Sequence, residues 1–211
     1  MSLDNQLKVM VISSSVPQEG KSTTAANLAV AISQLGQRVL IVDADMRKPS
    51  QHNIWQLPNQ VGLSSILTGQ SEFNQAVVEV MDNLEVLTSG IVPPNPLMLI
   101  DSSQMAVLVG QWAQTYDFVI IDSPPLSVAA DTTILGKMAN GLMFVVRPGV
   151  ANSGNLAYCK ELLEQSGQNV LGVVVNAVSR NSGSYYNNYY YYKSYGTEEA
   201  VEDDSATSRL S

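Results

Sequence analysis

The stretch Lys8-Val9-Met10-Val11-Ile12-Ser13-Ser14-Ser15-Val16-Pro17-Gln18-Glu19-Gly20-Lys21-Ser22-Thr23 decides the fold of this 211-residue chain. An apolar strand over residues 8–13 leads into a loop over residues 15–20, and Lys21 opens a helix. Loop and helix start match G-x-x-x-x-G-K-[ST], except that Ser15 replaces the first glycine. In this motif backbone N–H groups surround phosphate, the lysine contacts the outer phosphates and the hydroxyl ligates magnesium. The sequence therefore predicts a site for a nucleoside triphosphate.

The loop residues have separate expected roles. Gly20 lets the backbone approach the phosphates closely, and the helix that follows directs its positive end toward them. We expect Lys21 on an exposed loop that faces the phosphates. An accidental Gly-Lys-Ser in a serine-rich loop is the alternative, and the flanking strand and helix argue against it. The predicted nucleotide-binding residues of the loop are Gln18, Glu19, Gly20, Lys21, Ser22 and Thr23.

Composition narrows the class of protein. The formal net charge is −8, which argues against nonspecific nucleic-acid binding and against direct attraction to anionic lipid. The single cysteine, Cys159, is expected to be buried and cannot form an internal disulfide, as suits a reducing compartment. Because no apolar run approaches the length of a membrane span, we expect a soluble chain. The lone His52 has no cysteine or histidine near it in sequence and is predicted to be a surface residue rather than a ligand.

Apolar runs alternate with amphipathic stretches along the chain, a pattern typical of an α/β domain with a parallel sheet. The predicted fold is a doubly wound, mainly parallel P-loop sheet flanked by helices. Helices are expected at about 21–35, 64–67, 102–116 and 153–165. Strands are expected at 8–13, 38–43, 83–88, 118–122, 142–146 and 170–175.

The last part of the chain has a different composition. Residues 179–209 contain only one valine and two alanines as aliphatic residues, so they cannot build a core. We therefore predict a nucleotide-binding domain over residues 1–178 and a flexible, disordered tail over residues 179–211. An acidic patch lies between Glu198 and Asp204. Seven of the nine tyrosines fall in this tail: Tyr185, Tyr186, Tyr189, Tyr190, Tyr191, Tyr192 and Tyr195.

Carboxylates follow two of the predicted strands. Asp43 and Asp45 end one strand, just before Arg47, and Asp122 ends another. Because the carboxyl ends of parallel strands meet at one edge of a sheet, all three should lie near the phosphate loop. Magnesium takes one or two carboxylates plus phosphates and waters, so one aspartate can hold the ion with Ser22 while another acts on the nucleophile. Alternatively, Asp43 and Asp45 only cap a helix or pair with nearby basic residues.

Four further segments carry a resemblance to a known family. In order along the chain they are residues 42–49 (VDADMRKP), 62–69 (GLSSILTG), 93–96 (PPNP) and 120–125 (IIDSPP). Together with the terminal tyrosine cluster, these motifs resemble the bacterial tyrosine kinases (BY-kinases) that regulate export of capsular and extracellular polysaccharide. The resemblance runs from Val9 to the tyrosine tail. Two features depart from it: Ser15 and Gln18 stand where glycine is more usual, and only seven residues precede the first strand, without the family's ring-forming helix.

The resemblance implies ATP and Mg2+ as cofactors and specific roles for several residues. Lys21 would contact the outer phosphates, and Ser22 and Asp122 would hold the metal. Asp43 would accept the tyrosine proton, while Asp45 would hold a magnesium-bound water. A family asparagine near the adenine corresponds to Asn176. The tail tyrosines would be autophosphorylation sites, modified between neighbouring subunits of a homo-oligomer.

The predicted function is therefore a protein-tyrosine autokinase that regulates polysaccharide synthesis or export. By resemblance, it would work at the cytoplasmic face of the inner membrane with a membrane activator domain or adaptor. The alternative is a switch ATPase of the partition or cell-division type, with water as the nucleophile. Such ATPases usually carry a further lysine at the start of the loop, and residues 13–18 contain none.

Overall fold

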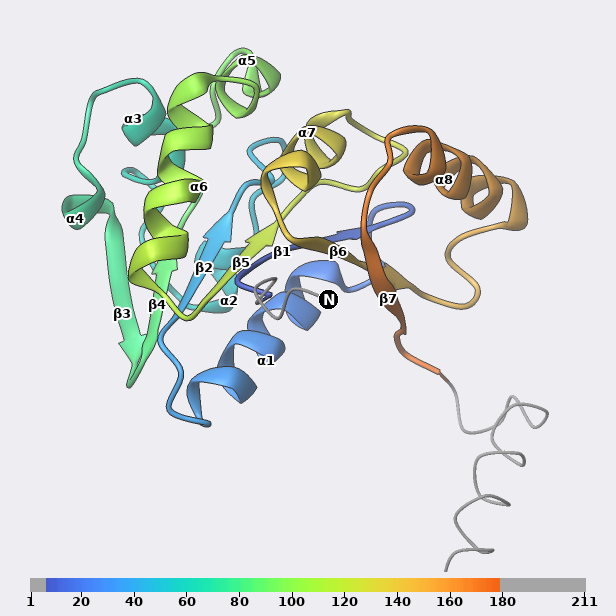
Figure 1. The fold of residues 1–211 in the computed structure, drawn as a ribbon, viewed down its shortest axis with the longest axis horizontal. Coiled ribbons are helices and arrows are strands. Elements are labelled where there is room, and N and C mark those ends of the chain that lie inside the picture. Colours follow the sequence, from blue (N-terminus) through green and yellow to red (C-terminus); the bar gives the residue numbers. More distant parts are fainter. Residues whose placement is uncertain (1–6, 179–211) are drawn as a thin grey trace, which may run out of the picture. The chain divides into compact units, whose positions relative to one another are not determined.

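The computed structural model describes residues 7–178, in which strands and helices alternate (Figure 1). The strands are β1 (Val9–Ser14), β2 (Val39–Asp43), β3 (Val77–Met81), β4 (Leu84–Leu87), β5 (Phe118–Asp122), β6 (Gly141–Val146) and β7 (Val170–Val175). The helices are α1 (Lys21–Ser33), α2 (Gln51–Ile54), α3 (Leu63–Leu67), α4 (Phe73–Ala76), α5 (Pro96–Ile100), α6 (Ser103–Thr115), α7 (Asp131–Met138) and α8 (Ser153–Gln165). The predicted tail and its seven tyrosines lie outside the described residues, and the domain division expected after residue 178 stays a prediction.

The strands form one sheet in the order β3-β4-β2-β5-β1-β6-β7. Every neighbouring pair is parallel except β3 with β4, which run antiparallel at one edge. The mainly parallel, doubly wound sheet predicted from the alternating apolar runs is therefore confirmed. Because β2, β5 and β1 are adjacent, the residues that follow their carboxyl ends meet at one place.

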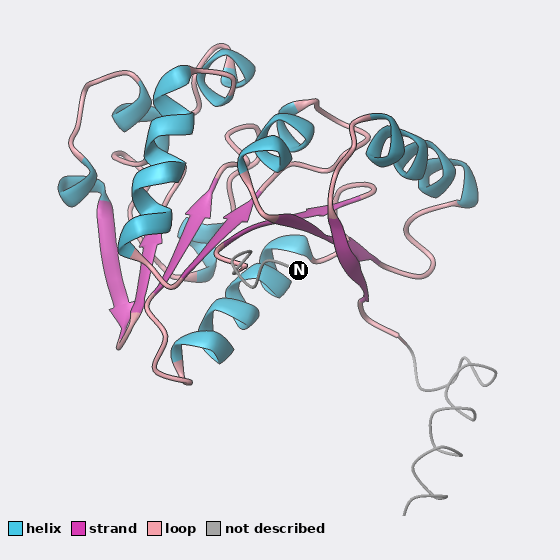
Figure 2. Cartoon of the chain, in the orientation of Figure 1, coloured by secondary structure: helices cyan, strands magenta, loops and turns pink. Residues whose placement is uncertain are grey.

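Helices cover both faces of the sheet, as Figure 2 shows for the helices drawn in cyan. One face packs against α1 through a row of alanines, Ala25, Ala26 and Ala29, which let the helix lie close to the strands. The other face packs against the long helices α6, α7 and α8. Since both faces are covered, the central strands β1, β2 and β5 consist mainly of buried apolar residues and carry buried serine or aspartate at their carboxyl ends.

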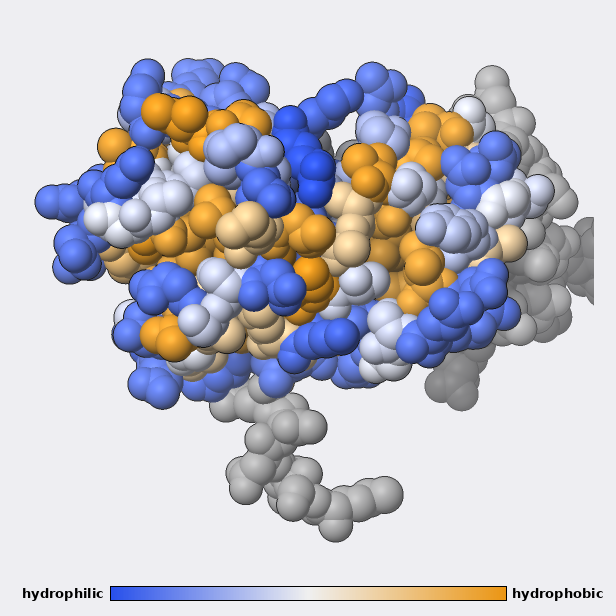
Figure 3. All heavy atoms as spheres, turned by 90° about the horizontal axis from the view of Figure 1, so that it is seen from above, coloured by the Kyte–Doolittle hydropathy of each residue, from blue (hydrophilic) through white to orange (hydrophobic). Residues whose placement is uncertain are grey.

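Five elements were not predicted: α2, α4, α5, α7 and strand β3. Three of the helices have only four or five residues, too few to show a helical repeat of apolar positions. As predicted, Cys159 is buried. None of the described helices is long and apolar enough to cross a membrane. Apolar side chains do reach the surface in places, as the orange atoms of Figure 3 show for one face.

Candidate nucleotide-binding and kinase site

The phosphate-binding loop joins the carboxyl end of β1 to the first residue of α1. Gly20 directly precedes the helix with a φ of 91°, in the left-handed region that favours glycine. Gln18 has a φ of 69°, so a non-glycine residue adopts a similar conformation inside the loop. Gln18, one of the two loop residues that stand where glycine is more usual, therefore has a backbone conformation that favours glycine.

A buried carboxylate holds the loop in place. Glu19 is fully buried, and its Oε2 accepts hydrogen bonds from the Ser15 hydroxyl at 2.7 Å and from the backbone N–H of Val16 at 2.8 Å. Its Oε1 accepts from the backbone N–H of Arg147, just after β6, at 3.0 Å. Sequence analysis placed Glu19 among the nucleotide-binding residues. Its side chain faces the protein and fastens the loop to the neighbouring strand.

The end of the last strand also contacts the loop. Asn176 follows β7 and donates from Nδ2 to the carbonyl oxygen of Glu19 at 2.9 Å. A Cβ atom at Gly20 would lie 2.1 Å from the same Nδ2, so a larger residue would displace the Asn176 side chain and would also be strained at a φ of 91°. The structure thus brings Asn176 to the loop, while its nearness to adenine, which the family resemblance implies, stays a prediction.

Lys21 is not exposed, contrary to our expectation. It is the first residue of α1, and only 9% of its surface is accessible. Its Nζ lies 2.9 Å from Asp45 Oδ2, 3.3 Å from Asp122 Oδ1 and 3.0 Å from the Ser22 hydroxyl. Burial lowers the pKa of this lysine, but the carboxylates of Asp122 and Asp45 outweigh the effect and raise the pKa above its ordinary value. The ammonium group is thus a fixed positive charge among oxygen atoms.

The two aspartates after β2 have different surroundings. Asp43 is fully buried, and its Oδ2 accepts hydrogen bonds from the backbone N–H groups of Ser50 and Gln51 at 2.8 and 2.9 Å. Burial and then the nearby carboxylate of Asp122 raise the pKa of Asp43 to about 8. Asp45 instead lies in the wall of a cavity beside Lys21. The capping role considered for these residues thus has a structural counterpart in the backbone hydrogen bonds to Asp43, whereas a role toward the nucleophile stays a prediction.

Sequence reasoning missed Gln51. This fully buried residue of α2 donates from Nε2 to Asp122 Oδ2 at 2.8 Å and to the Ser22 carbonyl oxygen at 3.1 Å. Its Oε1 accepts from the indole of Trp55 at 3.0 Å, which fixes the orientation of the amide. Gln51 therefore orients Asp122 from the side opposite Lys21. The only sequence signal was its place shortly after the Asp-x-Asp-x-Arg segment.

A cavity of about 520 Å³ opens beside the loop. Its wall brings together loop residues, the start of α1 and the segment after β2, as the sequence predicted. Four predicted site residues do not line it: Glu19, Asp43, Asp122 and Asn176. Arg47 does line it and donates from Nε to Asp131 at 3.0 Å. The lining residues include Gln18, Gly20, Lys21, Ser22, Thr23, Asp45, Arg47, Lys48 and Pro124.

The sheet order, the loop between β1 and α1 and the acidic strand ends define a P-loop nucleotide-binding protein. A family model described as an AAA domain matches residues 7–154. Over 186 residues the chain is 43% identical to the tyrosine-protein kinase YwqD of Bacillus subtilis, covering 88% of this chain and 78% of the relative. It is 37% identical to the putative tyrosine-protein kinase CapB of Staphylococcus aureus, covering 82% of that relative. The chain belongs to the family of bacterial tyrosine-protein kinases.

Solved structures agree with this assignment. The chimerical protein CapA2B2 superimposes with a TM-score of 0.82 at 43% identity, covering 84% of this chain and 79% of that chain. The kinase domain of the Escherichia coli tyrosine kinase ETK gives 0.81 at 31% identity, covering 87% and 72%. The septum site-determining protein MinD of Pyrococcus horikoshii gives 0.69 at 22% identity, covering 83% and 72%, which shows a shared fold alone.

Proposed function

We propose that this protein is an autokinase that transfers the γ-phosphoryl group of ATP to tyrosines of residues 179–211 and thereby regulates polysaccharide synthesis or export. The observation that carries the proposal is the placement of Lys21. Its ammonium group forms ion pairs with Asp45 and Asp122 beside the cavity that adjoins the phosphate loop. The outer phosphates of a nucleotide in the adjoining cavity would meet this charge directly, and membership of the tyrosine kinase family supports tyrosine as the acceptor.

The oxygen atoms around Lys21 fit a magnesium ion. Ser22 Oγ and Asp122 Oδ1 both lie within 3.3 Å of the ammonium nitrogen, so the protein gathers hard oxygen donors at a place already suited to positive charge. Among the described residues, no three acidic, histidine or cysteine side chains form a metal site by themselves. Such a donor set suits an ion that shares its ligands with phosphate, and we assign Ser22 and Asp122 to hold it. Bound there, Mg2+ would neutralise charge on the phosphates.

The reaction needs little covalent chemistry from the protein. The tyrosine oxygen forms a bond to the γ-phosphorus while the bond from that phosphorus to the β–γ bridging oxygen breaks, and ADP leaves. Lys21 and the backbone N–H groups of the loop stabilise the charge on the phosphates. The phenol proton must pass to a base, and the two aspartates after β2 are the nearest candidates.

We propose that Asp43 accepts the proton of the tyrosine hydroxyl and that Asp45 positions Lys21. With a pKa of about 8, the ionised form of Asp43 is a stronger base than an ordinary carboxylate, but most of the group is protonated at neutral pH, so transfer should speed up as the pH rises toward 8. Because its oxygens accept backbone hydrogen bonds from Ser50 and Gln51, the segment between β2 and α2 must shift before a phenol can reach it. Asp45 pairs with Lys21 at 2.9 Å and keeps the ammonium at the cavity wall.

The remaining assignments rest on the family. The acceptors are Tyr185, Tyr186, Tyr189, Tyr190, Tyr191, Tyr192 and Tyr195, and transfer between chains calls for a homo-oligomer. A membrane activator or adaptor would place the kinase at the cytoplasmic face of the inner membrane. A switch ATPase would be the competing function, and the MinD-like structures share the fold with this chain at low identity. The absence of lysine from residues 13–18 speaks against it.

The experiment is an intact-mass measurement of the full chain after incubation with ATP and Mg2+, followed by peptide mapping. We expect a ladder of phosphate additions on residues 179–211, lost in Lys21→Met and retained in the exposed-lysine control Lys137→Met. Release of ADP without any phosphate on the protein would favour the switch ATPase.

A further inference from the structure

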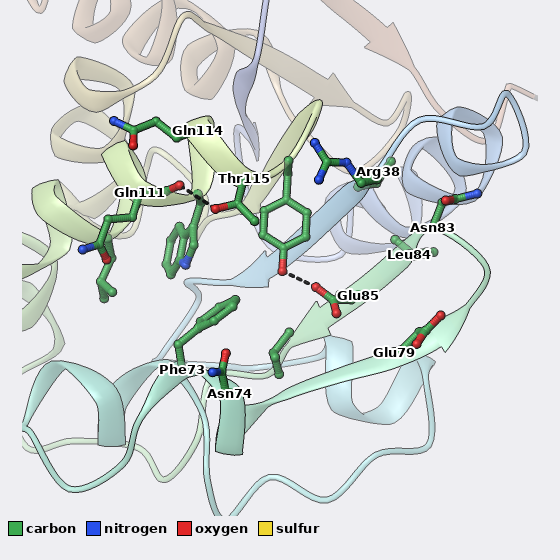
Figure 4. A pocket seen from close by; sticks show the side chains of 15 residues that line it. Arg38, Phe73, Asn74, Glu79, Asn83, Leu84, Glu85, Gln111, Gln114 and Thr115 are labelled. Carbon is green, nitrogen blue, oxygen red and sulfur yellow. Dashed lines mark hydrogen bonds between the residues drawn. The ribbon is translucent and has the colours of Figure 1, made fainter.

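A second cavity lies far from the nucleotide loop. It has a volume of about 740 Å³, opens to the surface and is lined by α4, α6, the β3–β4 hairpin and the residues that precede β2 and β5 (Figure 4). Arg38 directly precedes β2 and Tyr116 lies just before β5, whereas Asp43 and Asp122 end those two strands. The two cavities therefore lie at opposite ends of the same strands, so one can be occupied while the other holds nucleotide.

Two carboxylates face each other in the wall of this cavity. Glu79 of β3 and Glu85 of β4 are direct partners in the antiparallel register, and both line the cavity. Like charges placed opposite each other destabilise a strand pair. Within residues 7–178 no basic side chain pairs with either glutamate, and Arg38, the one cation in the lining, pairs with Asp117 at 3.5 Å. A positive charge brought into the cavity would remove this repulsion.

The rest of the wall is aromatic and apolar. The rings of Phe73 and Trp112 lie 5.9 Å apart and are tilted by 42°. Tyr116 completes this wall and donates its hydroxyl hydrogen to Glu85, the bond marked from Glu85 in Figure 4. Aromatic faces attract organic cations, and carboxylates form charge-assisted hydrogen bonds with them. The combination suits a guanidinium or ammonium group on an apolar stem, and it disfavours an anion.

The position of β3 at the edge of the sheet indicates which kind of molecule would bring a cation into this cavity. Within residues 7–178, β3 is the last strand at one end of the sheet and no strand pairs with its outer edge, so this edge can pair with an extended peptide. A peptide strand added beside β3 would place alternate side chains next to Val77 and Glu79, the two residues of β3 that line the cavity. The net charge of −8 further favours a basic partner.

We propose that the β3 edge and this cavity form a docking site for an extended basic segment of a partner protein, with an arginine or lysine side chain inserted between Glu79, Glu85 and the partly exposed ring of Phe73, which packs against the buried Trp112. The site is independent of the phosphate loop and adds a recognition surface to the kinase. Charge complementarity and the open strand edge select this occupant over a small free cation, which would use only the cavity.

The test uses the full chain without ATP and a peptide of alternating valine and arginine. The chain has two tryptophans, so a nitrogen-correlated NMR spectrum contains two indole N–H signals. We expect the peptide to move the Trp112 signal and leave that of Trp55, beside the nucleotide site, unchanged. A peptide of alternating valine and glutamate serves as the control, and N-acetylarginine amide tests whether the cation alone suffices.

The variants separate recognition from folding. We expect Glu79→Gln combined with Glu85→Gln to weaken peptide binding about tenfold, as two lost ion pairs would, and Glu161→Gln on exposed α8 to have no effect. Glu79→Gln alone should unfold at the same temperature as the parent or higher, because it removes the cross-strand repulsion. Three results would overturn the proposal: the double variant binds the arginine peptide as tightly as the parent, the glutamate peptide binds equally well, or only the Trp55 signal moves. If N-acetylarginine amide binds as tightly as the peptide, the occupant is a small cation and the proposed strand pairing along β3 is wrong.

Discussion

Ser15 donates its hydroxyl hydrogen to Glu19 at 2.7 Å, so the residue that replaces the usual first glycine of the loop is held by a carboxylate of the same loop. That carboxylate also accepts hydrogen bonds from the backbone N–H groups of Val16 and Arg147. The loop is therefore shaped before any phosphate arrives, and the cost of ordering it falls on folding rather than on binding.

Glu19→Ala should weaken ADP binding by about tenfold, because the part-buried N–H groups of Val16 and Arg147 would lose their acceptor, at about 1 kcal/mol for each hydrogen bond. Glu19→Gln keeps one carbonyl oxygen in place and should fall between this variant and the parent. Calorimetric titration with ADP measures the affinity. Equal ADP affinities for the parent and both variants would show that the hydrogen bonds of Glu19 do not shape the loop.

Lys21→Met should abolish most phosphoryl transfer and also lower stability, because Lys21 is buried against Asp45 and Asp122. Removing one partner of a buried ion pair costs on the order of 3 kcal/mol. Urea unfolding measures this cost, and intact mass measures transfer. The exposed-residue control Lys137→Met should change neither quantity, and normal phosphorylation of Lys21→Met would remove this lysine from the site.

Asp122→Asn should weaken ADP binding more in the presence of Mg2+ than in a chelator, because the carboxylate is proposed to hold the metal. Since Asp122 also accepts from Gln51 at 2.8 Å, the variant is compared with Ser22→Ala, which leaves that bond intact. Both variants should lose affinity chiefly with the metal. Equal losses with and without Mg2+ would indicate a distorted loop instead.

Transfer should occur between chains. The acceptor segment follows Asn176, which bonds the phosphate loop, so a tyrosine would need a sharp reversal of the chain to reach its own nucleotide. An inactive Lys21→Met chain is mixed with an active chain that ends at Ser179, and phosphate on the inactive chain is measured. We expect labelling that rises steeply with protein concentration. If the inactive chain stays unlabelled where the full-length protein modifies itself, transfer takes place within one chain.

The free energy of unfolding should fall more steeply above pH 10 in the parent than in Tyr116→Phe. Burial and then the bond to Glu85 raise the pKa of Tyr116 above its ordinary value of 10.0. Above pH 10 the unfolded chain loses this proton while the folded chain retains it, so stability decreases with pH by up to about 1.4 kcal/mol per unit. Urea unfolding at a series of pH values checks this, and Tyr158→Phe on exposed α8 should keep the parent slope.

Much of the fold could be predicted because the central strands are buried on both faces. Residues 118–122 and 170–175 have the boundaries expected from their apolar runs. β3 was missed because its five residues are few and Glu79 interrupts their apolar run. The short helix α2 was missed because four residues show no repeat, and the backbone bonds to Asp43 that hold it are not visible in sequence.

The site was predictable where it follows strand ends. Asp43 and Asp122 are neighbours in the register of β2 and β5, so their proximity follows from the strand order. The burial of Lys21 could not be read from the motif, since it depends on carboxylates that arrive from two other strands. Gln51 likewise acquires its contact with Asp122 only in three dimensions.

The hydrogen bond from Asn176 to Glu19 sets a limit on how far the protein can be shortened. A fragment cut after residue 178 loses every proposed acceptor yet retains the amide that packs against Gly20. A fragment that stops with β7 at Val175 would leave the Glu19 carbonyl oxygen without this donor and open a gap beside the loop. The smallest fragment suited to crystallisation with nucleotide, or to screening for inhibitors, therefore has to extend past the last strand.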